Sequence, residues 1–269
     1  MATDAAALAA GIRPGMPATK AQVLVPGLVT QNAHPAADAE ALERLAVWTL
    51  QRFAPIAAAD PPDGIVIDTT GAAHLHGGEQ TMLETLIGRL AMSGVAARAA
   101  IADNWGAAHA LARFASEPAT VAARGHGTAP LMALPLEALR LPAPMVADLR
   151  VLGFERIGDL LAQPRAPLTL RFGPELGRRL DQASGVLSEP IERVQSPDLI
   201  EVRRAFAEPI GAAETIARYI GKLVGDLCAA FEARGLGARR LDLLCQRVDN
   251  RAQVVRVGMA VPVRDATRL

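Results

Sequence analysis

The chain has 269 residues, of which 51% are hydrophobic and 21% are charged. Because domains commonly run to about 100–200 residues, this length predicts more than one module. No apolar run approaches the roughly 18 residues that span a bilayer, which excludes a membrane-embedded protein. The opening residues, MATDAAALAAGIRPG, lack the pattern of a secretion signal, so we expect a globular protein of the cytoplasm.

The net charge is zero, but the charge is unevenly distributed. Residues 1–128 carry 8 basic and 11 acidic side chains, whereas residues 196–269 carry 12 and 9. Only Lys20 and Lys222 of the 28 basic residues are lysines. Arginine suits phosphate contacts because its planar fork can bind two oxygens, although a GC-rich genome would produce the same bias. Cys228 and Cys245 are predicted to be buried thiols rather than a disulfide.

The first half of the chain predicts a small α/β unit. Apolar periodicity and turn residues predict helices over residues 4–10, Thr19–Val25, Asp38–Phe53, 80–92 and Trp105–Ala115. Runs rich in β-branched or apolar residues predict strands over Gly64–Thr70 and Val95–Ala102.

The second half changes character after residue 130. Residues 131–186 contain short helical segments separated by Gly and Pro, with no convincing strand, and predict a compact helical module. A polar, proline-bounded linker follows over Glu189–Asp198. An α/β sandwich is then predicted from strands near Val202–Phe206, Leu241–Val248 and Gln253–Val261 and a long helix over Ala212–Arg234.

Three stretches, in this order, resemble segments of the Y-family (translesion-type) DNA polymerases. They are AGIRPGM at residues 10–16 with LVP at 24–26, PPDGIVIDTTG at 61–71 running into HLHGGE at 74–79, and AIADNW at 100–105. The surroundings of Leu75–Glu79 are similar to the catalytically inactive ImuB-type (UmuC/DinB-like) subgroup. The resemblance implies an α+β multidomain fold, truncated at both ends. Its expected parts are a fingers-like segment (1–35), a palm-like α/β domain without its first strand (36–128), a helical thumb with a helix-hairpin-helix (129–190) and a partial little finger (197–269).

Catalytic chemistry is where the chain departs from this family. Polymerisation needs carboxylates that hold two magnesium ions about 3.5–4 Å apart. The resemblance matches Asp63 to the Asp of the family's Asp-Glu pair, but Gly64 stands in the place of the Glu. The family's triphosphate-binding Tyr, Arg and Lys match Ala5, Leu8 and Trp105. Asp63 is therefore predicted to be a residual catalytic carboxylate that is insufficient alone. No cofactor is expected, and Mg²⁺ only if residual polymerase activity exists.

These residues also have ordinary structural interpretations. Asp63 follows two prolines and suits a turn. His74 and His76 indicate a solvated turn more than a zinc site, because no Cys or third His lies near them in the sequence. Trp105 suits the core at a helix start, with base stacking as the alternative.

Residues 141–160 read as helix, glycine-containing hairpin and helix, a shape that can aim backbone N–H groups at a phosphate. The alternative for this hairpin is that it packs only for structure. For the arginines before the strand that begins at Leu241, the alternative is that their charge protects an exposed strand edge from aggregation. A second turn, over 171–174, precedes another arginine-bearing helix, and the resemblance places the start of the 241 strand against the DNA backbone. The predicted DNA-binding residues are Arg150, Gly153, Arg156, Arg171, Gly173, Arg178, Arg179, Arg239 and Arg240.

The leading hypothesis is a non-catalytic, Y-family polymerase-like DNA-binding accessory protein in translesion synthesis and DNA-damage-induced mutagenesis. The alternatives are an error-prone translesion polymerase whose N-terminal catalytic strand is missing, and a fragment that folds poorly. The expected partner is DNA, bound without regard to sequence, and no membrane. The resemblance further implies a replicative-type error-prone polymerase and a RecA-like accessory protein. Clamp binding is not supported, because the chain contains no Gln-x-x-Leu-x-Phe peptide.

Overall fold

The structure is a computed structural model that describes residues 3–13, 15–125, 127–196, 199–249 and 252–269. The chain divides into two compact units, Met1–Leu42 and Glu43–Leu269, and each is described by itself. Within the described ranges, no helix is both long enough and apolar enough to cross a membrane.

The first unit contains two short helices and the start of a long one. Helix α1 spans Ala5–Ala9, and the Asp4 carboxylate caps it by accepting the Ala7 N–H at 2.7 Å. Helix α2 spans Ala18–Leu24. Helix α3, Pro35–Arg52, begins in this unit and continues into the second.

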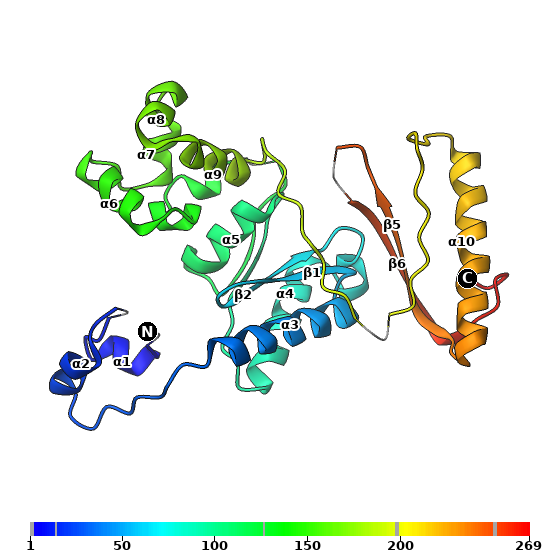
Figure 1. The fold of residues 1–269 in the computed structure, drawn as a ribbon, viewed down its shortest axis with the longest axis horizontal. Coiled ribbons are helices and arrows are strands. Elements are labelled where there is room, and N and C mark those ends of the chain that lie inside the picture. Colours follow the sequence, from blue (N-terminus) through cyan, green and yellow to red (C-terminus); the bar gives the residue numbers. More distant parts are fainter. Residues whose placement is uncertain (1–2, 14, 126, 197–198, 250–251) are drawn as a thin grey trace. The chain divides into compact units, whose positions relative to one another are not determined.

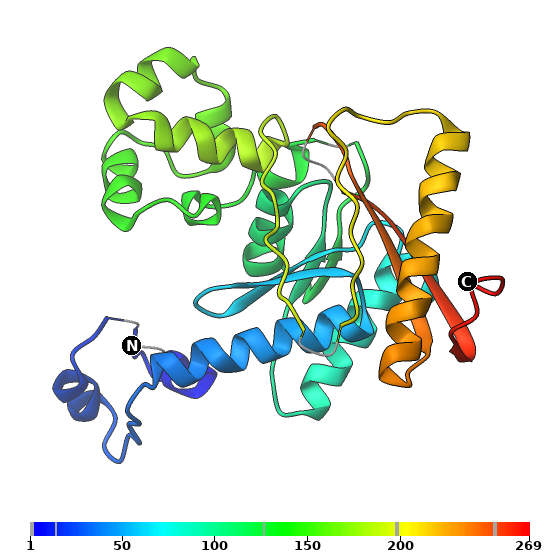
Figure 2. The same ribbon diagram turned by 45° about the vertical axis from the view of Figure 1, so that its right-hand side comes forward.

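The α/β part of the second unit contains two strand pairs. Strand β1 (Ile56–Asp60) is antiparallel to β2 (Gly64–Asp68), and β3 (Ala99–Ile101) is parallel to β4 (Ala119–Val121). The 3-10 helix η1 (Ala73–His76) and helices α4 (Glu79–Met92) and α5 (Trp105–Phe114) complete it. Helix α4 packs Met82, Leu86 and Leu90 into a core around Phe53, which is fully buried. Figure 2 shows this part with the segment that follows α9 running across the β1–β2 hairpin, where the Val194 N–H donates to the Ala57 carbonyl at 2.8 Å.

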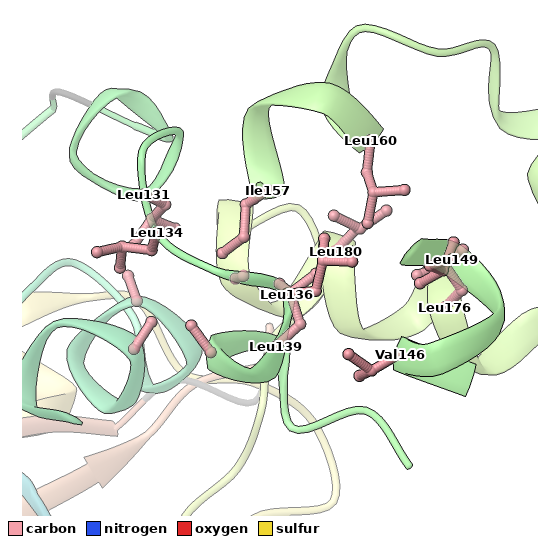
Figure 3. Close-up of a cluster of buried hydrophobic side chains, with 14 of the residues drawn as sticks. Leu131, Leu134, Leu136, Leu139, Val146, Leu149, Ile157, Leu160, Leu176 and Leu180 are labelled. Atoms are coloured by element: carbon pink, nitrogen blue, oxygen red, sulfur yellow. The ribbon is translucent and has the colours of Figure 1, made fainter. Parts of the chain in front are cut away.

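The helical module, residues 129–185, has its own apolar core. Leucines from most of its helices meet there, as Figure 3 shows, and Leu136, Leu149, Leu160 and Leu176 are fully buried. Alanines of α5 pack against the same cluster and join the module to the α/β part. Its elements are η2 (Ala129–Leu131), η3 (Leu136–Leu139), α6 (Ala143–Val151), α7 (Ile157–Leu161), α8 (Arg165–Phe172) and α9 (Pro174–Ser184).

The C-terminal part is one long helix beside one long hairpin. Helix α10 (Ala213–Arg234) lies along the antiparallel pair β5 (Ala238–Gln246) and β6 (Ala252–Val263) (Figure 1). Leu227 and Phe231 of the helix pack against Ala238, Leu241 and Met259 of the strands.

The structure confirms the predicted helices to within a few residues and the absence of strands in the described part of 131–186. It corrects the strands. Residues 202–206, predicted as a strand, have no strand pairing among the described residues, and only 99–101 of the predicted 95–102 strand pairs. Strands β1 and β4 were not predicted at all. The four-domain division stays a prediction.

Candidate functional site

The β1–β2 turn, residues 60–64, carries the one predicted catalytic residue. Asp60 ends β1 and pairs in register with Gly64, the first residue of β2, so that Asp63 stands at the tip. The two intervening prolines have no N–H to donate, so the ladder ends at the Asp60–Gly64 pair. The Asp63 side chain is 63% exposed, whereas that of Asp60 is only 18% exposed.

Helix α5 presents two side chains to this turn. His109 and Arg113 are four residues apart and therefore share one face of the helix. Arg113 Nη2 donates to Asp63 Oδ1 at 2.7 Å, and Arg113 Nε donates to His109 Nε2 at 2.9 Å. His109 Nε2 also lies 3.8 Å from Asp60 Oδ2. The turn is thus tied to α5 by one arginine and approached by one histidine.

The electrostatics of this cluster follow from Arg113 and from the burial of His109. The hydrogen bond from Arg113 holds the pKa of the Asp63 carboxyl below its usual range. Burial, followed by the charges of Arg113 and Arg140, lowers the pKa of His109 to about 4. The His109–Asp60 approach is therefore not an ion pair at neutral pH, in agreement with His109 Nε2 accepting the Arg113 hydrogen bond. The buried Nδ1 atom of the same ring has no hydrogen-bond partner in the described part of the chain.

The residues of the turn do not fit the two magnesium ions that a polymerase fold implies. Gly64 offers no carboxylate, and a Cβ added to it would lie 3.1 Å from Arg113 Nη2 and 3.1 Å from the Asp60 carbonyl oxygen. Asp63 already uses one oxygen on a guanidinium. Among the described residues, no group of three or more His, Cys, Asp and Glu side chains is arranged to hold a metal ion. A two-metal site needs several carboxylate oxygens at once.

Trp105 lies at a groove beside β1 rather than in the core. The Arg140 guanidinium lies 5.3 Å from the centre of its ring. Glu192 and Arg193 also line the groove, which has a volume of about 470 Å³, and Arg193 is already paired with Glu201 at 2.6 Å. A triphosphate in this groove would meet carboxylates, and no described lining residue offers it an unpaired positive charge. The groove therefore does not provide the nucleotide contacts that the family resemblance implies.

The helix-hairpin-helix is present as α6, a turn at Gly153 and α7, but its amides are occupied. The Asp159 carboxylate accepts the N–H groups of Glu155 and Arg156 at 2.9 and 2.8 Å. In this structure these amides are therefore not free for a phosphate, and a DNA contact at Gly153 stays a prediction. The remaining N–H groups from 152 to 158 donate to carbonyls of Leu149, Arg150, Leu134 and Met132.

Most of the predicted DNA-binding arginines have internal partners. Arg150 pairs with Glu137 at 2.7 Å, Arg178 pairs with Glu175, and Arg179 pairs with Glu175 at 3.1 Å and lies 3.6 Å from Glu189. Two others donate to backbone oxygens, Arg156 to Ala133 and Arg240 to Gln51.

Arg171 and Arg239 differ from these. Both are exposed and form no ion pair with any described residue, although Arg171 lies over the ring of its neighbour Phe172. Gly173, between α8 and α9, has φ +76° and ψ −178°, a backbone region that only glycine adopts readily. A DNA contact at these three positions stays a prediction, and the Gly173 N–H already donates to the Thr169 carbonyl at 2.9 Å.

The histidines of η1 are only partly as predicted. His74 is exposed, but His76 lies 3.2 Å from the Phe53 carbonyl oxygen and stacks on the Phe53 ring, with 5.2 Å between ring centres. His76 is therefore a packing residue rather than a solvated one. Sequence reasoning missed His109 and Arg113 altogether. Their i, i+4 spacing on a predicted helix was the available signal, but it did not reveal that they face the β1–β2 turn.

No protein-family model matches the chain. Protein ImuB of Caulobacter vibrioides is 49% identical over 261 residues, covering 96% of this chain and 56% of that protein. DNA polymerase IV of Halorhodospira halophila is 26% identical over 211 residues, covering 76% and 58%. Among solved structures, a Dbh ternary complex has a TM-score of 0.56 at 15% identity, covering 98% of this chain and 79% of that one. DinB from Sulfolobus solfataricus gives a TM-score of 0.56 at 17% identity, covering 97% and 77%.

These likenesses define the class: the chain has the fold of the Y-family DNA polymerases. Within that class the chain is an ImuB-like homologue, by its identity with ImuB along nearly all of its length. The chain spans little more than half the length of the curated relatives it matches, 56% of ImuB and 58% of the polymerase.

Proposed function

We propose that this chain is a non-catalytic, DNA-binding accessory protein of translesion synthesis and DNA-damage-induced mutagenesis. The observation that carries the non-catalytic part is the β1–β2 turn, where Gly64 replaces a carboxylate and Asp63 is bound by Arg113. One carboxylate in a hydrogen-bonded ion pair does not suffice for a two-metal reaction.

The DNA-binding part rests on the fold and on exposed arginines. Solved structures with this fold include an insertion ternary complex of Dbh DNA polymerase, and Arg171 and Arg239 are exposed cations without an ion-pair partner among the described residues. Such contacts recognise phosphates and therefore bind all sequences alike. By the same resemblance we propose a replicative-type error-prone polymerase and a RecA-like accessory protein as partners, and the cytoplasm as the location.

A primer-extension assay with Mg²⁺ or Mn²⁺, run beside a DNA-binding titration on the same purified protein, tests both parts. We expect binding to primed DNA and no nucleotide incorporation above background, with an active Y-family polymerase as the positive control. The second candidate function, an error-prone DNA polymerase, is favoured by the presence of Asp63 at the matching position. Incorporation that disappears on Asp63→Ala would establish that candidate and reject the non-catalytic proposal.

A further inference from the structure

The cation already present at the β1–β2 turn is the Arg113 guanidinium. Its Nη2 atom lies 2.7 Å from Asp63 Oδ1, and its Nε atom lies 2.9 Å from His109 Nε2. The same Nη2 atom is 3.1 Å from where a Cβ of residue 64 would lie, and Asp60 Oδ2 is 3.5 Å from that point. The guanidinium therefore fills the space beside Gly64 into which a second carboxylate would project.

We infer that Arg113 is the permanent cation of this turn and that it keeps a divalent metal ion away from Asp60 and Asp63. This inference deepens the proposed non-catalytic function and rests on it. It adds a physical cause for the lack of catalysis. The turn lacks the carboxylate that Gly64 replaces, and in addition the Arg113 guanidinium occupies the space beside Gly64.

Charge and ligand chemistry both support the exclusion. A divalent cation approaching Asp60 and Asp63 would be repelled by the fixed positive charge beside them, and a few ångströms of separation make this repulsion strong at a partly buried site. Arg113 also occupies the donor atoms that a metal would need, one Asp63 oxygen and the His109 Nε2 lone pair. Asp60, less exposed than Asp63, lies beside them, 3.8 Å from His109 Nε2.

Removing Arg113 should accordingly open a cation site. The freed groups would be two carboxylates and one neutral imidazole, which are not arranged around one ion in the wild type and would have to turn toward it. Such a mixed oxygen and nitrogen set suits Mn²⁺ better than Mg²⁺. An arginine that merely ties the turn to α5 would give a different result, because its loss would then weaken the fold without creating any affinity for metal.

The test is a titration with MnCl₂, following free Mn²⁺ by its paramagnetic resonance signal, on the wild type and four variants. We expect only weak Mn²⁺ binding by the wild type, and in Arg113→Ala an affinity at least roughly tenfold stronger than that of the wild type. Arg113→Lys keeps the positive charge and should stay at the wild-type level. Arg113→Ala combined with Asp63→Asn should lose the gain. Arg124→Ala, which breaks the exposed pair with Glu79, is the matched control and should gain nothing.

Arg113→Gln, which keeps much of the side chain's length, replaces Arg113→Ala should the latter fail to fold, and should likewise gain Mn²⁺. The inference is overturned when the wild type binds Mn²⁺ as tightly as the folded Arg113→Ala or Arg113→Gln variant, or when neither of these two variants gains affinity. Primer extension and DNA binding by the same samples separate the two proposals. Mn²⁺ binding by the wild type without nucleotide incorporation rejects only the role of Arg113, whereas a wild type that excludes Mn²⁺ and binds no DNA rejects only the proposed function.

Discussion

At the β1–β2 turn, the charges of individual residues are set by contacts between the turn and helix α5. His109 contacts Arg113 and Asp60 and is kept neutral by burial, while Asp63 is kept ionised by Arg113. The sequence predicted only Asp63 of these residues. His109 and Arg113 lie about fifty positions further along the chain, and their proximity to Asp63 arises from the packing of α5, which no local pattern encodes.

His109 should make the stability of the protein depend on pH. Its pKa falls from 6.5 to about 4 on folding, so the unfolded chain takes up a proton between these values that the folded chain does not. Its contribution to stability is therefore full above pH 6.5 and is lost as the pH falls towards 4, by about 2 kcal/mol at pH 5.

His109→Gln, whose amide oxygen can still accept from Arg113, should remove about that much of the difference between the unfolding free energies at pH 7 and pH 5. Urea denaturation at the two pH values measures it. The matched control, His74→Gln, removes an exposed histidine and should not flatten the profile. An unchanged pH profile in His109→Gln would contradict the assignment, even though burial lowers the pKa of His76 as well.

Gly64→Glu should not restore polymerase activity. The new side chain would start 3.1 Å from Arg113 Nη2 and from the Asp60 carbonyl oxygen, so these neighbours would have to shift by a few tenths of an ångström. The family's triphosphate-binding side chains would remain replaced at Leu8 and Trp105. Primer extension by this variant should stay at background, and measurable incorporation would show that these losses matter less than we infer.

Among the secondary-structure elements, the helices were predicted well from their apolar periodicity, whereas strands that depend on pairing with another segment were not. The helices now seen as α3, α4, α5 and α10 were predicted closely, because helix hydrogen bonds are local and the buried stripe is visible in the sequence. Strand β1 was missed because the three alanines between Pro55 and Pro61 have a low propensity for strands. The extended conformation of this segment is stabilised by its pairing with β2, which the local sequence does not show. Residues 202–206 have the composition of a strand but pair with no described segment.

The junction of α8 and α9 offers a sharp test of backbone conformation. Gly173 has φ +76° and ψ −178°, and nothing lies within 4 Å of an added Cβ, so that strain alone opposes a side chain there. Gly173→Ala should destabilise the protein by about 1–3 kcal/mol. Gly177→Ala is the matched control within α9: its Cβ would make only an ordinary contact with Thr169 at 3.8 Å, and alanine favours a helix interior by about 1 kcal/mol. Chemical denaturation of both variants should show opposite signs, and equal losses would contradict this account.

At the scale of the whole chain, the net charge is zero, so DNA binding would depend on local groups of exposed cations rather than on the overall charge. Internal pairs occupy the guanidinium groups of Arg150, Arg178 and Arg179, and the amides of the hairpin at Gly153 are taken by neighbouring acceptors. Sequence alone could count these arginines, but it could not tell which ones fold against a carboxylate. The partition between paired and unpaired cations therefore decides where a phosphate can bind.

Arg171→Ala and Arg239→Ala should each weaken DNA binding alike for all sequences. A cation that contacts phosphate releases bound counterions, so its loss should lower the slope of log K against log salt by about one unit. Arg178→Ala should change that slope less, because Glu175 already competes for its guanidinium. Fluorescence anisotropy on two unrelated DNA sequences, from about 50 to 200 mM salt, measures both quantities. Binding that is undetectable at about 50 mM salt, or insensitive to salt, would reject DNA as the partner and leave protein contacts as the better explanation.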